Sequence, residues 1–148
     1  MEAFPTNAVV STASRRDLDK GITYAVMVLD RSVSMEGNPA TQLLEGAADF
    51  LEEMREVPTP VKVSFDLFAS GAPRRGTFAL AVETDYLTRE RYVPNGGGTA
   101  IYDAIHDAVA HVETEKRAQD RAVVCVFTDG QENASKAHTV RDTAALIA

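Results

Sequence analysis

The chain has 148 residues, of which 45% are hydrophobic and 25% charged, a composition typical of one soluble globular domain. The formal net charge of −7 disfavours nucleic acid or an anionic membrane as partner, because neither would find a basic patch. The single cysteine, Cys125, excludes a disulfide framework and a thiolate zinc site, and we expect it to be a small core residue.

Residues 1–20 are polar and mixed, and we expect an N-terminal arm there, with a short extended piece around Val9 and Val10. This arm lacks the charged start and apolar centre of a secretory signal. No apolar stretch approaches the ~18 residues expected of a membrane span. These observations predict a cytoplasmic protein whose folded domain covers residues 21–148.

The domain opens with an uninterrupted apolar run, Tyr24 to Leu29, that ends at Asp30. A run this short and this apolar predicts a central strand covered on both faces. Apolar residues at helical spacing then predict an amphipathic helix over residues 39–56, with Asn38 as its N-cap and a proline in its first turn.

Alternating residues follow over 61–69, where Ser64 and Asp66 stand between apolar neighbours. This period of two predicts a second strand. After a turn, residues 76–82 predict an antiparallel partner at the edge of the sheet. A short helical turn is expected around residues 88–91.

A run of glycines at 96–98 precedes a second amphipathic helix, predicted over residues 100–112. His106 and His111 are five positions apart on it, so we expect them on different faces and at the surface. Residues 122–127 form a second wholly apolar run and predict a buried strand.

A last helix is expected to begin near residue 136 or 138 and to continue to the end of the chain. Alternating strands and helices predict an α/β fold. The expected architecture is a Rossmann-like, mostly parallel sheet with helices on both faces and one antiparallel edge strand.

Five side chains with oxygen atoms stand at the ends of these strands or at the start of a helix: Asp30, Ser32, Ser34, Thr99 and Asp129. In open α/β sheets, ligands bind beyond the carboxyl ends of the strands, so the three segments are expected to meet there. Oxygen ligands suit a hard cation, Mg²⁺ first, with Mn²⁺ and Ca²⁺ as alternatives. A cation held mostly by neutral hydroxyls keeps positive charge and attracts an acidic side chain.

Each residue also has a simpler interpretation. Thr99 could be the N-cap of its helix, Asp129 could belong to an Asp-Gly turn, and Asp30 could cap its own loop. Their joint occurrence favours the metal site. Arg31 lies on the rim of that site and is a candidate for orienting an acidic partner.

The stretches YAVMVLDRSVSM, GGGTAIYDAI and FTDGQENAS resemble the metal-ion-dependent adhesion site of von Willebrand factor type A domains, most closely the intracellular bacterial and phage members. The resemblance implies that Ser32, Ser34 and Thr99 are direct ligands and that Asp30 and Asp129 act through water. It also implies metal-dependent protein binding rather than catalysis.

The chain departs from the family pattern in two places. Val33 stands where many relatives have a small residue. The family sheet has about six strands, so we expect this domain to be abbreviated at its C-terminus and to lack the last strands. The strand at 122–127 would then border an unpaired edge, open to self-association or to completion by another chain.

The favoured function is therefore a divalent-metal-dependent protein-interaction module, not an enzyme, that binds a Glu or Asp of a partner. One alternative is a metal-assisted hydrolase or phosphotransferase with Asp30 as nucleophile or ligand. The set contains no histidine to serve as general base, which favours binding. Another alternative is an assembly scaffold subunit with a vestigial metal site.

Overall fold

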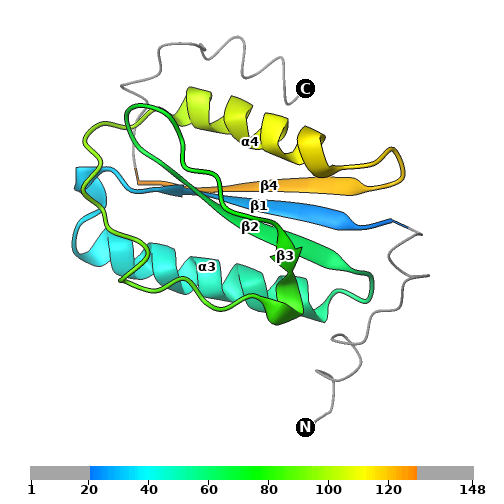
Figure 1. The fold of residues 1–148 in the computed structure, drawn as a ribbon. Helices are drawn as coiled ribbons and strands as arrows, with labels where there is room; N and C mark the ends of the chain where they lie inside the picture. The colour runs from blue at the N-terminus through cyan, green and yellow to red at the C-terminus, as the bar shows by residue number, and fades with distance from the viewer. Residues whose placement is uncertain (1–20, 130–148) are drawn as a thin grey trace, which may run out of the picture.

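The computed structural model describes residues 21–129. Four strands form one sheet in the order β3-β2-β1-β4, and the two long helices, α3 and α4, lie on opposite faces of it (Figure 1). Three strands are parallel and β3 is antiparallel at one edge. The predicted fold class is confirmed.

The central strand is β1 (Thr23–Asp30), which pairs in parallel with β2 (Val61–Phe68) and β4 (Arg121–Phe127). Seven of its eight residues are buried, because helices cover both faces. Alternate side chains enter two cores, Ala25, Met27 and Leu29 toward α3, and Tyr24, Val26 and Val28 toward α4.

Helix α3 (Asn38–Glu56) follows a short 3₁₀ turn, η1 (Val33–Met35), and packs one face against the sheet. Its buried residues recur at intervals of three and four, as the sequence predicted: Ala40, Leu43, Ala47 and Leu51. The predicted N-cap is wrong by one residue, because Gly37 occupies that position and Asn38 is already helical.

Strand β2 has two buried polar residues, Ser64 and Asp66, on the face that α4 covers. Its antiparallel partner β3 (Ala79–Leu80) is shorter than predicted, because the 3₁₀ turn η2 (Ala81–Glu83) begins directly after it. Around residues 88–91 the chain forms a hydrogen-bonded turn rather than a regular helix.

Helix α4 (Ile101–Glu115) covers the other face with small residues, Ala104 and Ala108 among them. His111 is also buried here, so its predicted surface position is wrong. Its Nδ1 lies 2.7 Å from an oxygen of Asp66, and its ring packs against Phe78 with centroids 4.6 Å apart. A carboxylate on β2 provides the polar partner that lets an imidazole enter the core.

The edge strand β4 differs from the buried strand that was predicted. Its first three residues are exposed and the rest are half-buried, Cys125 included, so the cysteine is not a core residue. Within the described residues β4 pairs only with β1 and ends the sheet, as expected. The predicted N-terminal arm, with Val9 and Val10, and the last predicted helix lie outside the described residues.

None of the helices within residues 21–129 has the length and apolar character needed to cross a membrane.

Candidate functional site

The carboxyl ends of the parallel strands meet at one edge of the sheet, where α3 and α4 also begin (Figure 1). Asp30 is the last residue of β1 and is fully buried. Thr128 and Asp129 come directly after β4. Parallel pairing of β1 with β4 therefore brings the first and third predicted segments to the same place.

The Asp30 carboxylate joins these two segments. One oxygen accepts a hydrogen bond from the Ser32 backbone N–H at 2.8 Å, which is the local cap that its sequence position also suggested. The other oxygen accepts one from the Thr128 hydroxyl at 2.6 Å, across 98 residues of sequence. Asp30 thus does more than cap its own loop.

A chain of hydroxyl contacts leads from this buried acid to the surface. The Oγ atoms of Ser32 and Ser34 lie 3.1 Å apart, and Ser34 donates to an oxygen of Asp129 at 3.2 Å. Ser32 is buried, whereas Ser34 and Asp129 are exposed. The structure therefore brings four of the five predicted residues together through direct or successive hydrogen bonds.

The glycine loop is held against the same segment by backbone hydrogen bonds. Gly96 N–H donates to the Arg31 carbonyl at 3.0 Å, and Val33 N–H donates to the Gly97 carbonyl at 3.2 Å. Gly97 has a φ of 87°, a conformation that favours glycine. The second predicted segment therefore packs directly on the first.

Thr99 follows this loop and is buried, with 3% of its surface exposed. Its alternative role as the N-cap of α4 is wrong, because Ala100 holds that position and the cap has no side-chain hydrogen bond. Thr99 is thus a buried hydroxyl residue next to a loop that contacts Arg31 and Val33.

Sequence reasoning missed Tyr92, which is fully buried and whose hydroxyl donates to the backbone carbonyl of Asp30. Burial, together with the negative charges of Asp30 and Asp129, raises the pKa of Tyr92. The sequence signal was weak, since it consists of one aromatic residue in a loop. This hydrogen bond attaches the segment 84–100, which contains Tyr92, to the end of β1.

The donor set consists of oxygen atoms, which fits a hard divalent cation rather than zinc or copper. Among residues 21–129 no group of three or more His, Cys, Asp or Glu side chains is placed to hold a metal ion. A cation at this edge would therefore depend on the serine and threonine hydroxyls, with Asp30 and Asp129 supplying negative charge nearby.

The molecule is an α/β domain with an oxygen-rich edge beyond the carboxyl ends of its strands, which is where open α/β sheets bind ligands. The model of the von Willebrand factor type A domain family matches residues 25–131, well over half of the chain and all three segments described above. The chain therefore belongs to this family, whose domains are generally protein-interaction modules, often metal-dependent. No curated protein matches the chain.

Proposed function

We propose that this domain binds a protein partner through a divalent cation, Mg²⁺ first, with Mn²⁺ and Ca²⁺ as alternatives. The cation would take an Asp or Glu side chain of the partner. The observation that carries the proposal is the meeting of three remote segments, through the Asp30–Thr128 and Ser34–Asp129 hydrogen bonds and the docked glycine loop.

The proposed direct ligands are Ser32, Ser34 and Thr99, with Asp30 and Asp129 acting through water. Both oxygens of Asp30 already accept hydrogen bonds from the protein, which supports an indirect role for that carboxylate. When bound, the cation supplies positive charge and an open position. Neutral hydroxyl ligands leave most of that charge available for an incoming carboxylate.

We propose binding rather than catalysis. The groups of the site that could act as a general base are its two carboxylates. Asp30 already accepts hydrogen bonds on both oxygens, and Asp129 accepts one from the Ser34 hydroxyl. The buried His111 on the neighbouring helix is engaged with Asp66 inside the core.

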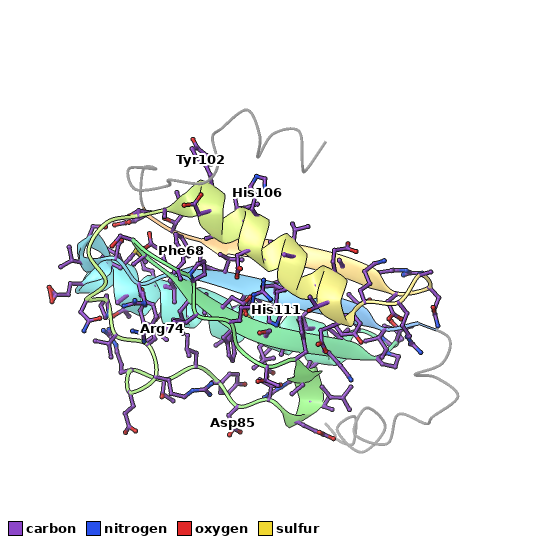
Figure 2. All side chains as sticks on the ribbon, turned by 45° about the horizontal axis from the view of Figure 1, so that its top comes forward. Phe68, Arg74, Asp85, Tyr102, His106 and His111 are labelled. Carbon is purple, nitrogen blue, oxygen red and sulfur yellow. The ribbon has the colours of Figure 1, made fainter. Side chains whose placement is uncertain are left out.

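The first experiment measures cation binding by calorimetry and by thermal unfolding in Mg²⁺, Mn²⁺, Ca²⁺ or EDTA. Asp129→Asn removes one exposed carboxylate from the site and is expected to weaken cation affinity by about tenfold. Asp85→Asn removes a carboxylate that is also exposed but lies in the segment after η2 (Figure 2), and it is expected to leave affinity unchanged. A melting temperature that ignores every cation and the chelator would contradict the proposal and favour a scaffold with a vestigial site.

The second experiment is a pulldown in Mg²⁺ and in EDTA, followed by neutralisation of acidic residues in the captured partner. Capture is expected in Mg²⁺, to be lost in EDTA and with Ser34→Ala, and to persist with Asp85→Asn. Ser34 is exposed, so its alanine variant is expected to fold. A partner whose affinity survives loss of all its exposed carboxylates would contradict the cation-bridged contact.

A further inference from the structure

Two arginines near this edge have no carboxylate partner among residues 21–129, although the chain has 22 acidic and 15 basic residues. They are Arg31 and Arg74. Three other arginines each have an acidic partner: Arg55 with Glu52, Arg75 with Asp107, and Arg117 with Asp120. Arg89, Arg91 and Arg121 also have no carboxylate partner among residues 21–129, but all three are exposed, whereas Arg31 is half-buried and lies beside the oxygen-rich site.

The guanidinium of Arg31 occupies a defined position on the glycine loop. Its Nη1 donates to the Asn95 side-chain oxygen at 3.3 Å, and its Nε is buried with no hydrogen-bond partner. A Cβ on Gly96 would lie 2.8 Å from Arg31 Nη1 and 2.4 Å from the Cβ of Ala69. The missing side chain of Gly96 is what lets the guanidinium rest there.

Arg74 is exposed in the loop after β2, beside the end of that strand (Figure 2). Two backbone hydrogen bonds with Leu67, of 2.9 and 2.7 Å, fix its main chain. Arg31 N–H donates to the Phe68 carbonyl at 2.8 Å, so the main chains of Arg31 and Arg74 are both held at the end of β2. In line with this placement, burial, and then the charge of Arg74, lowers the pKa of Arg31. Both remain charged at neutral pH.

Two guanidinium groups with spare donors at the end of one strand can bind one anionic group. Resting on the function proposed above, we propose that Arg31 and Arg74 bind a second carboxylate of the same protein partner. The preferred partner segment then carries two acidic side chains, one directed to the cation and one held by the arginines. Arg31 lies between Asp30 and Ser32 in the chain, so the two acids would bind side by side.

The test uses an array of immobilised synthetic peptides of glycine and serine that carry either one Glu or two Glu at increasing spacing. The labelled protein is applied in Mg²⁺ and in EDTA. Two-acid peptides of the best spacing are expected to bind about tenfold more tightly than one-acid peptides. This advantage is expected to fall below about twofold with Arg31→Gln and with Arg74→Gln.

Arg75→Gln is the matched control, because it removes the same charge from the adjacent residue, which is already paired with Asp107. It is expected to keep the two-acid advantage. Circular dichroism establishes that each variant folds, and the exposed Arg74 provides a second variant should Arg31→Gln fail to fold.

Equal binding of one-acid and two-acid peptides by the unmutated protein would overturn the inference, as would arginine variants that keep the preference. One-acid binding that is the same in Mg²⁺ and EDTA would instead overturn the cation-dependent function. In that case the loss of the two-acid preference in Arg31→Gln and Arg74→Gln is measured in EDTA, so the inference about the arginines is tested separately. A protein that binds no peptide in either buffer overturns both.

Discussion

Two buried aspartates on neighbouring parallel strands have opposite surroundings. Asp66 lies within β2 under α4 and is 2% exposed. One of its oxygens accepts hydrogen bonds from Ser64 Oγ at 2.6 Å and Gly76 N–H at 3.0 Å, and the other lies 2.7 Å from His111 Nδ1. The fold itself supplies every partner of this carboxylate.

Asp30 is buried as completely, but it stands at the end of β1, and its side-chain partners are the neutral donors of Ser32 and Thr128. Among residues 21–129 it has no ion pair. From it, hydroxyls lead outward to the exposed Asp129. Burial alone therefore does not distinguish the two carboxylates, whereas, within the described residues, the presence of an imidazole partner beside Asp66 and its absence beside Asp30 do.

The largest expected effect is that of Asp66→Ala, which removes the hydrogen-bond partner of Ser64, Gly76 and His111 together. We expect the free energy of unfolding to fall by about 3–5 kcal/mol, measured by urea denaturation with circular dichroism. The stabilisation by Mg²⁺ should persist in the variant. A loss under about 1 kcal/mol would contradict the structural role assigned to this network.

Asp30→Ala is expected to cost about 2–3 kcal/mol in EDTA, because the Ser32 amide and the Thr128 hydroxyl lose their acceptor. The unmutated protein should gain about 2.7 kcal/mol when the cation is present at one hundred times its Kd. The variant should gain nothing. A folded Asp30→Ala protein that still responds to Mg²⁺ would remove the contrast with Asp66.

A third acid, Asp120 at the opposite ends of the strands, provides a reference with a strong internal cation. It accepts hydrogen bonds from the backbone N–H groups of Ile22 and Arg117, both at 2.8 Å, and from Arg117 Nε at 3.0 Å. The hydrogen bond from the Arg117 side chain, with these backbone N–H groups, lowers the pKa of Asp120 from 3.8 to about 2, although burial acts in the opposite direction.

Because the folded pKa of Asp120 lies below the unfolded value, its stabilisation is present above pH 3.8 and is lost as the pH falls toward 2. Asp120→Asn should cost about 1–2 kcal/mol at neutral pH and flatten this acid limb. Urea denaturation at several pH values between 3.8 and about 2 measures how the free energy of unfolding changes with pH in both proteins. An unchanged acid limb in the variant would assign the pH dependence to other groups.

The smallest expected effect is that of Tyr92→Phe, which removes the hydroxyl that donates to the Asp30 carbonyl. We expect a loss of about 1 kcal/mol, with cation affinity reduced less than twofold. Thermal unfolding and calorimetry measure the two quantities. A large loss of cation affinity would mean that this phenol positions the site and does more than stabilise the end of β1.

The elements with strong apolar periods were predictable from the sequence. The run before Asp30 gave β1, and the helical spacing of residues 39–56 gave α3 within one residue of its start. The edge position of β4 was also predictable. The prediction that β4 is buried was wrong, because an apolar run indicates a strand but does not tell how many strands and helices cover it.

Part of the site was also predictable, because strand-end residues of parallel strands emerge at a common edge. The meeting of Asp30 with Thr128 and of Ser34 with Asp129 follows that rule. Their roles as cation ligands remain a prediction. The burial of His111 and the contact of Tyr92 could not be predicted, since each depends on a partner supplied by a distant segment.

The sequence by itself determined the order of strands and helices and the placement of acids and hydroxyls at strand ends, because apolar periodicity and chain direction are local properties. Only the tertiary structure decided which buried acid contacts an imidazole and which is linked through hydroxyl groups to the exposed edge of the sheet. The Asp66–His111 contact spans 45 residues and the Asp30–Thr128 contact spans 98, so both depend on how the sheet and its helices pack. Two aspartates of the same type therefore differ because different residues surround their carboxylates in the folded protein.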